Sequence, residues 1–249
     1  MPDAMFADRR LAPLYDAFDG ERDDLAAYHA IADERGARLV LDVGCGTGSL
    51  AVLLAAHGHA VVGVDPAEAS LEVARRKEGA AKVRWIHGDA TALPALDADL
   101  AVMTGNVAQV FLADEDWAAT LRGIRGALRP HGMLVFETRR PGYRAWEEWA
   151  ADSGPVVRDV PGSGPVERRL EVVDVRLPLV SFRHTFRFLA DGTEITSDST
   201  LRFRDRDEVT ATLTTAGYRV LDVREAPDRP GREFVVLAER AGGAGLAVP

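Results

Sequence analysis

The sequence contains little cysteine and little lysine. Cys45 is the only cysteine among 249 residues, Lys77 and Lys82 are the only lysines, and the other basic residues are arginines. A single cysteine excludes an intramolecular disulfide and a zinc site built from several thiolates. With so few lysines and many alanines and glycines, the arginines reflect composition bias rather than a phosphate-binding surface.

Long apolar runs are also missing. No window reaches 18 uninterrupted apolar residues, so no transmembrane helix is expected, and the opening MPDAMFADRR does not resemble a secretory signal. We therefore expect a cytoplasmic protein. The net charge of −9 repels phosphate backbones and anionic lipids, which disfavours nucleic-acid and membrane partners.

What is present is an ordinary globular composition with a regular alternation of short elements. Apolar residues make up 47% and charged residues 28% of the chain. Strands are predicted at 38–43, 60–65, 82–87, 99–105 and 132–139, with helices at 49–57, 66–77 and 114–130. A helix at 205–217 and paired strands at 218–225 and 232–240 follow later. This alternation predicts a Rossmann-like α/β sheet that binds its ligand at the carboxyl ends of the strands.

Two segments lie outside this pattern. Residues 1–36 are predicted to form a helical cap with a helix at 21–35. Residues 141–205 are predicted to form a β-rich insert, which contains a short aromatic helix, a Gly/Pro-rich link at 154–165 and three antiparallel strands. The core is then 37–140 with 206–240. Residues 241–249 are expected to be a disordered tail.

The glycine-rich segment VLDVGCGTG (40–48) carries the clearest functional pattern. Gly44, Gly46 and Gly48 follow a predicted strand and precede a helix, where tight turning lets a ligand approach the backbone. Asp42 precedes the loop and Asp65 ends the next strand, where an acid accepts hydrogen bonds from ribose hydroxyls.

Two ligand classes fit a glycine loop of this kind. A dinucleotide fingerprint needs a third glycine at position 49, where this chain has Ser49, and a neutral loop near the pyrophosphate. Asp42 instead favours a ligand with a positively charged amine, such as S-adenosylmethionine. An NAD(P)-dependent oxidoreductase stays the alternative.

The residues Asp42 to Gly48, Asp65 and Gly88-Asp89-Ala90 together resemble class I S-adenosylmethionine-dependent methyltransferases of the small-molecule type. The resemblance implies a mostly parallel seven-stranded sheet with one antiparallel strand, the insert acting as a lid, and S-adenosylhomocysteine as the product. It implies that Asp42 and the Gly44–Cys45–Gly46 backbone hold the methionine end. The other cofactor contacts that it implies come from Asp65, Pro66, Asp89, Ala90, Thr104 and Gly105.

The methyl acceptor is expected to be a small molecule that is methylated on N or O and contacts the cap and the insert. Tyr15 and His184 are the candidate catalytic and acceptor-binding residues, with Phe182, Asn106 and Gln109 as further acceptor contacts. No obligatory catalytic residue stands out, so a non-catalytic methyltransferase-like subunit is a second alternative. The exposed edges of the insert suggest a homodimer.

No bound metal is expected from the sequence. The other histidines show no paired ligand spacing and are interpreted as surface or hydrogen-bonded residues: His29, His57, His59, His87 and His131.

Overall fold

The computed structural model describes residues 2–20, 22–152 and 154–242, so residues 243–249 of the predicted tail lie outside the described residues. Seven strands form the main sheet: β1 (Leu39–Val43), β2 (Ala60–Asp65), β3 (Val83–His87), β4 (Ala98–Met103), β5 (Leu128–Arg139), β10 (Tyr218–Glu225) and β11 (Glu233–Arg240). Their order is β10-β11-β5-β4-β1-β2-β3. Only β11 runs antiparallel to its neighbours, which confirms the predicted fold class.

Helices cover both faces of this sheet because each strand between them is apolar on both sides. The helices of the core and its leading segment are α3 (Asp24–Glu34), α4 (Ser49–Ala56), α5 (Glu68–Ala74), α6 (Asp114–Ala127) and α8 (Arg206–Thr215). Side chains of α3 and α4 pack in one buried cluster, and side chains of α6 and α8 in another on the opposite face.

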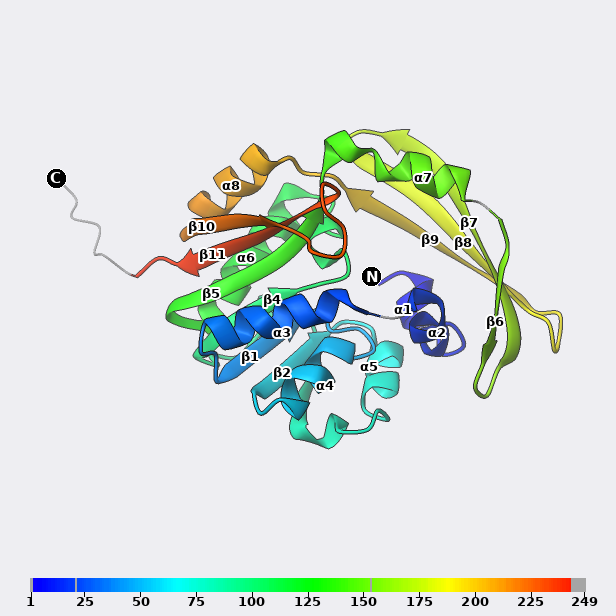
Figure 1. Cartoon of the computed structure of the whole chain (residues 1–249), viewed down its shortest axis with the longest axis horizontal. Coiled ribbons are helices and arrows are strands. Elements are labelled where there is room, and N and C mark those ends of the chain that lie inside the picture. Colours follow the sequence, from blue (N-terminus) through cyan, green and yellow to red (C-terminus); the bar gives the residue numbers. More distant parts are fainter. Residues whose placement is uncertain (1, 21, 153, 243–249) are drawn as a thin grey trace.

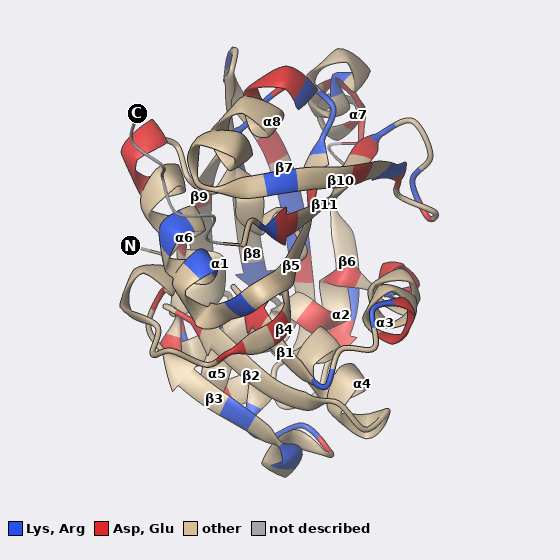
Figure 2. Ribbon diagram, turned by 90° about the vertical axis from the view of Figure 1, so that its left-hand side faces the viewer, with Lys and Arg blue, Asp and Glu red and all other residues tan. Residues whose placement is uncertain are grey.

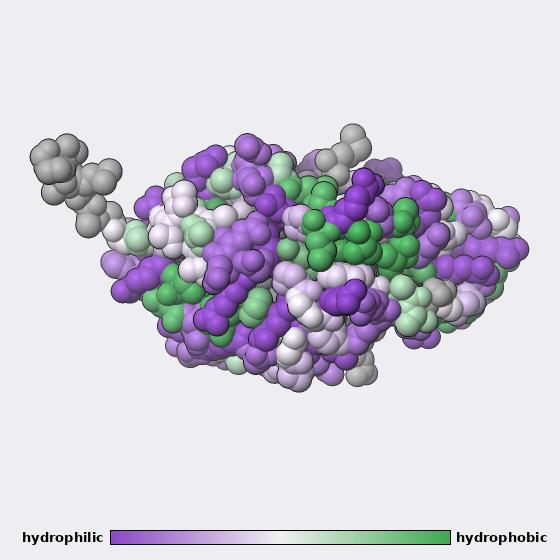
Figure 3. Space-filling model, turned by 90° about the horizontal axis from the view of Figure 1, so that it is seen from above, coloured by the Kyte–Doolittle hydropathy of each residue, from purple (hydrophilic) through white to green (hydrophobic). Residues whose placement is uncertain are grey.

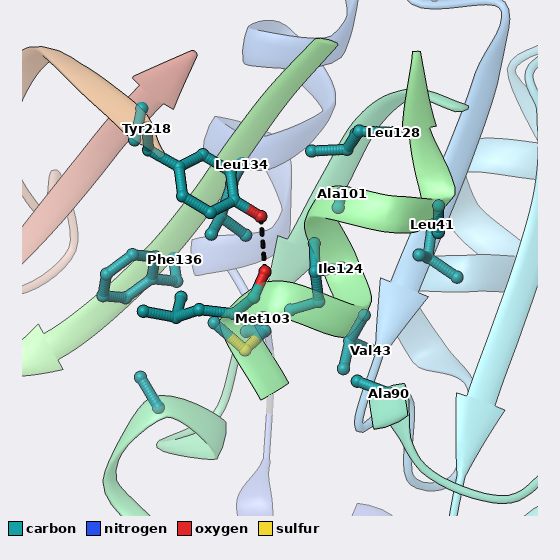
Figure 4. Packing of buried hydrophobic residues seen from close by; sticks show 14 of the residues in the cluster. Leu41, Val43, Ala90, Ala101, Met103, Ile124, Leu128, Leu134, Phe136 and Tyr218 are labelled. Atoms are coloured by element: carbon teal, nitrogen blue, oxygen red, sulfur yellow. Dashed lines mark hydrogen bonds between the residues drawn. The ribbon is translucent and has the colours of Figure 1, made fainter. Parts of the chain in front are cut away.

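The larger cluster shows how the sheet and its helices are joined (Figure 4). Met103 and Phe136, from neighbouring strands, lie fully buried beside Ile124 of α6. The Tyr218 hydroxyl donates a hydrogen bond of 2.9 Å to the Leu121 carbonyl, so the one polar atom of this aromatic side chain is satisfied. Each such buried side chain contributes roughly 1.5–3 kcal/mol of hydrophobic stabilisation.

The insert forms a second, antiparallel sheet that lies beside the core (Figure 1). Its strands, in spatial order, are β6 (Val156–Val160), β7 (Gly164–Arg176), β8 (Leu179–Phe188) and β9 (Glu194–Arg202). The predicted short aromatic helix is α7 (Ala145–Ala151), which contains Trp146 and Trp149. The prediction of three strands was wrong: the segment 156–160, expected to be part of a link, pairs with β7 through a tight turn containing Gly162.

The two faces of β8 differ in the burial of their side chains. Phe186 is buried and His184 half-buried on one face, whereas Arg183 and Arg187 on the other are exposed. The buried face points towards the N-terminal segment, since Met5 and Phe18 join the same apolar cluster as Phe186. The segment connects the two sheets.

The N-terminal segment, residues 2–20, comprises α1 (Ala4–Ala7), a 3-10 turn (Ala12–Leu14) and α2 (Tyr15–Asp19). It lies between the core and the second sheet (Figure 1). The Met5 amide donates 2.8 Å to Ser197 of β9, and Ser70 of α5 donates 2.9 Å to the Phe6 carbonyl.

Charged residues are spread over both parts of the molecule, with basic and acidic positions interspersed (Figure 2). Many form ion pairs, such as Arg224 with Glu34 at 2.9 Å. Across the described residues, no helix has the length and apolarity that crossing a membrane requires.

Candidate active site

The glycine loop connects β1 to α4 at the edge of the sheet that faces the N-terminal segment. At Gly44, where φ is +70°, an added Cβ would lie 2.6 Å from Val107 Cγ2, so only glycine fits. At Gly46, where φ is +52°, an added Cβ would meet nothing within 4 Å. The loop is thus closely packed behind Gly44 and open over Gly46, as a ligand that approaches the backbone requires.

Asp65, at the end of β2, is bound by backbone donors on both oxygens. The Gly46 amide donates 2.8 Å to Oδ2, and the Ala67 amide 2.7 Å to Oδ1. Burial raises the pKa of the carboxyl, and the two amides oppose that rise. Each carboxylate oxygen has a second lone pair, so the group can still accept hydrogen bonds from two hydroxyls.

Asp42, unlike Asp65, has no backbone donor bound to its carboxylate oxygens. Its side chain is 1% exposed, and neither carboxylate oxygen has a hydrogen-bond partner. Burial, with the charge of Asp65 as a smaller cause, raises its pKa to about 7. An unpaired buried carboxylate is costly, and a ligand ammonium group would supply both the charge and the donors. The residues around Asp42 therefore fit the amino acid end of S-adenosylmethionine.

The remaining predicted cofactor residues lie along the same edge. Asp89 is exposed and caps a short 3-10 turn by accepting 2.8 Å from the Thr91 amide, while Ala90 is buried. Pro66 is exposed after β2. Cys45 is buried in the loop, and burial raises the pKa of its thiol, so its backbone is the part available to a ligand.

Thr104 and Gly105 follow β4, and Gly105 is held by a carboxylate that sequence reasoning missed. The Gly105 amide donates 2.7 Å to Glu137 Oε1, and the Tyr28 hydroxyl donates to Oε2 of the same group. Glu137 is 5% exposed and directly follows the apolar run Met133–Phe136 of β5. A charged residue at the end of such a run was the available signal for this contact.

Asn106 and Gln109 have protein partners. Asn106 accepts 2.8 Å from Arg139 Nε. Gln109 is fully buried; its Oε1 accepts 3.3 Å from the Arg139 amide, and its Nε2 lies 3.5 Å from the Arg202 carbonyl. These contacts tie the loop after β4 to the strand that leads into the insert.

A series of aromatic contacts connects this loop with the predicted acceptor residues. The Arg139 guanidinium lies 5.2 Å from the Trp149 ring, and Trp149 meets Phe182 at 5.4 Å between centroids. Phe182 in turn meets His184 at 5.5 Å. The structure thus brings Asn106, Phe182 and His184 into one connected set.

Tyr15 approaches the site from the N-terminal segment. Its hydroxyl lies 3.7 Å from the Cβ position of Gly105, and burial raises its pKa well above the ordinary value. The neighbouring Asp16 accepts 2.6 Å from Thr47 Oγ1 of the glycine loop and 2.7 Å from Lys77 Nζ. This contact, the Asp16 latch, fixes Tyr15 beside Gly105.

A family model described as a methyltransferase domain matches residues 40–132, which include the glycine loop, Asp65 and Asp89. Residues 40–132 form a methyltransferase domain. The match confirms the resemblance to methyltransferases seen in the sequence, and the NAD(P) alternative loses its support.

Relatives of the methyltransferase domain match over part of their length. The chain is 37% identical over 106 residues to the cypemycin N-terminal methyltransferase of a Streptomyces species. The aligned region covers 42% of this chain and 43% of that protein. The chain thus spans less than half of this relative.

Solved structures match over nearly the whole chain. The CcbJ methyltransferase of Streptomyces caelestis is 20% identical with a TM-score of 0.74, covering 96% of this chain and 98% of that one. CalS10 of Micromonospora echinaspora, an amino pentose methyltransferase solved with S-adenosylmethionine bound, is 22% identical with a TM-score of 0.68, covering 91% and 94%. At these identities the likeness concerns the fold.

Proposed function

We propose that the whole protein is an S-adenosylmethionine-dependent methyltransferase that moves the methyl group to a nitrogen or oxygen atom of a small-molecule acceptor. The observation that carries the proposal is the buried, unpartnered Asp42 carboxylate beside the open Gly46 backbone. The small-molecule acceptor is supported by the amino pentose methyltransferase that shares this fold.

The chain's own residues would bind and orient the cofactor. Asp42 would pair with the ammonium group, Asp65 would accept from the ribose hydroxyls, and Asp89, Ala90 and Pro66 would border the base. The remaining contacts with the methionine end would come from Gly44, Cys45, Gly46, Thr104 and Gly105. When bound, the cofactor supplies a methyl carbon already activated by its sulfonium.

Positioning of the acceptor is the main task that remains for the protein. An in-line displacement needs the attacking atom close to the methyl carbon and aligned with it, and orientation of this kind contributes roughly 7–11 kcal/mol. Tyr15 on the cap and Phe182 on the insert are proposed to contact the acceptor from opposite elements. Asn106 would help to place the acceptor indirectly, through its hydrogen bond to Arg139 and the contact of Arg139 with Trp149. Gln109 would do so by holding the backbone of Arg139 at the end of β5.

His184 is the residue that we propose as a proton acceptor. Burial, and the nearby charge of Arg168, lower its pKa to about 4, so the imidazole is neutral at pH 7. Its Nδ1 is buried without a hydrogen-bond partner. With this pKa the imidazole does not hold a proton at pH 7, so its unused nitrogen would accept a hydrogen bond from the attacking amine or hydroxyl and relay the proton to solvent as the methyl is transferred.

The test has a binding arm and a turnover arm. Calorimetry with S-adenosylhomocysteine should give one site on the full chain, and labelled S-adenosylmethionine should transfer its methyl to members of a panel of small amines, amino sugars and hydroxyl compounds. A His184→Gln variant should lower kcat roughly 100-fold while cofactor affinity stays unchanged. Absence of cofactor binding would overturn the proposal.

Cofactor binding without transfer to any compound of a complete metabolite extract would favour the non-catalytic subunit instead. The division of labour, with 37–140 and 206–240 as the cofactor-binding core, 1–36 as cap and 141–205 as lid, belongs to the proposal. So does a cytoplasmic location, which rests on the sequence composition.

A further inference from the structure

A cluster of imidazole and carboxylate groups lies at the other edge of the sheet, away from the glycine loop. His29 and Asp33 are one turn apart on α3, and His59 directly precedes β2. The ligand atoms of these three side chains all lie within 4.8 Å of one another. We propose that His29, Asp33 and His59 form a binding site for a divalent transition metal ion of the zinc type.

The histidine on the β2 side is already oriented as a metal ligand would be. His59 Nδ1 lies 2.8 Å from the Ala37 carbonyl, a contact that places the proton on Nδ1 and leaves the lone pair on Nε2. That Nε2 is buried and has no hydrogen-bond partner. A carbonyl that fixes the tautomer from the far side of the ring is the usual support of a metal-bound histidine.

The distances within the cluster are longer than good hydrogen bonds. His29 Nε2 lies 3.4 Å from Asp33 Oδ2, and His59 Nε2 lies 3.5 Å from Asp33 Oδ1, whereas hydrogen bonds of this kind are about 2.7–3.2 Å. Zinc bonds of about 2.0–2.1 Å in a tetrahedron place neighbouring ligand atoms roughly 3.3–3.4 Å apart. Each imidazole thus faces a different oxygen of the Asp33 carboxylate at a distance close to that between neighbouring zinc ligands, which is compatible with a shared metal ion.

The donor set selects the class of ion. Two imidazole nitrogens and one carboxylate suit zinc and its neighbours, whereas calcium and magnesium prefer oxygen ligands throughout. Asp33 is 61% exposed, which leaves room for water at the fourth position. The His57 ring lies tilted against the His29 ring, with 4.0 Å between ring centroids.

The place of the site indicates a structural role. A bound ion would tie α3, whose Tyr28 and Ile31 pack in the core, to the turn between α4 and β2. Because parallel strands begin at this edge and the glycine loop leaves from the opposite one, metal binding should stabilise the fold without touching the cofactor residues. The inference departs from the expectation of no metal and is independent of the proposed function.

Zinc calorimetry on the chelator-treated full chain, produced without a polyhistidine tag, tests the proposal. We expect one ion per chain and a higher Tm with zinc, with at least tenfold weaker binding in His59→Gln and in His29→Gln. The matched control is His131→Asn, at an exposed histidine outside the cluster. His131 has a left-handed backbone conformation, which asparagine also tolerates. It should bind zinc like the unchanged protein.

A cobalt titration gives a readout that does not depend on stability. Tetrahedral coordination should produce visible absorption in the unchanged protein and in His131→Asn, and none in His59→Gln. Equal zinc affinity in all four proteins, or no binding by the unchanged chain, would overturn the site. Cofactor affinity should be the same with and without zinc, so either proposal can fail alone.

Discussion

At the residue scale, two acids of the glycine loop region have different electrostatic environments. Asp65 already accepts from two backbone amides, so its negative charge is compensated in the absence of a ligand. Asp42 has no such donors and is fully enclosed. The first carboxylate is therefore organised to receive hydroxyl groups, and the second to receive a cation.

Replacing Asp65 should weaken cofactor binding. Hydrogen bonds to a charged group contribute about 1.5–3 kcal/mol each, so Asp65→Ala should lower the affinity for S-adenosylhomocysteine roughly 10- to 100-fold or more, as measured by calorimetry. Asp159→Ala, at an exposed acid on β6, serves as the control and should bind normally. Equal affinity in both variants would contradict the assignment of Asp65 to the ribose.

The raised pKa of Asp42 predicts a pH dependence of cofactor binding. At pH 6 about a tenth of the carboxyl groups are ionised and at pH 8 about nine tenths, since the pKa is about 7. Only the ionised form pairs with an ammonium group. Affinity for S-adenosylhomocysteine should therefore rise about tenfold between pH 6 and pH 8, and Asp42→Asn should bind weakly at both.

Stability without ligand should change in the opposite direction. The folded-state pKa of Asp42 is raised from 3.8, so its contribution to stability is fully present below the unfolded value and is lost as pH rises through about 7. Asp42→Asn should remove this loss, giving a higher Tm than the unchanged protein at pH 8. Thermal unfolding of both proteins from pH 5 to 8 measures it; parallel curves would count against the raised pKa.

At the scale of elements, the N-terminal segment joins the two sheets at the site. Its Asp16 latch contacts the glycine loop and Lys77, which follows α5. Its Met5 amide contacts β9, and Phe18 packs on Phe186 with ring centroids 5.9 Å apart. These contacts place Tyr15 beside Gly105. In the proposed function, the segment covers the cofactor and the insert bounds the acceptor.

Breaking the Asp16 latch should release the cofactor faster. In Asp16→Asn the charge-assisted bonds to Thr47 and Lys77 are weakened, so Tyr15 is held less firmly. We expect S-adenosylhomocysteine to dissociate roughly 3- to 10-fold faster in stopped-flow measurements, a change of about 1 kcal/mol.

A control for the Asp16 latch exists in the same segment. The Arg9–Glu72 pair at 2.7 Å is exposed, with 78% of the arginine side chain accessible, and exposed pairs contribute little. Arg9→Ala should therefore change the dissociation rate less than twofold. If S-adenosylhomocysteine dissociated equally faster from both variants, the effect would reflect any change in the N-terminal segment and not the loss of the Asp16 latch.

At the scale of the whole molecule, the insert leaves apolar side chains in contact with solvent. Val173, Val175 and Leu177 are 54%, 41% and 57% exposed on or just after β7, and Figure 3 shows apolar side chains gathered on one area of a largely hydrophilic face. Strand β6 forms an edge of the second sheet. Both features support the proposal that two copies associate through the insert.

Light scattering in solution tests the dimer. The unchanged protein should have twice the mass of the 26.9 kDa chain, and Val173→Glu should shift it towards the monomer because a charge would be buried in the interface. Leu221→Glu, at a residue 40% exposed on β10 of the core, should stay dimeric. A monomeric unchanged protein would contradict association through the insert.

The sequence by itself determined the core fold and most of the candidate cofactor residues. Alternating apolar strands and helices specify a parallel sheet because burial on both faces needs that pattern. A glycine loop between strand and helix, followed by Asp65, fixes where a ligand meets the sheet. These are local properties, each readable within about 20 residues.

Only the tertiary structure decided the contacts between distant segments. Glu137 with Gly105, the Asp16 latch and the grouping of His29 with His59 join residues 30 or more positions apart, and no local period encodes such pairs. The fourth strand, β6, was missed for the same reason, since its pairing with β7 outweighed the flanking glycines and prolines. Long-range pairing depends on the packing of the whole chain, which the sequence of one segment does not reveal.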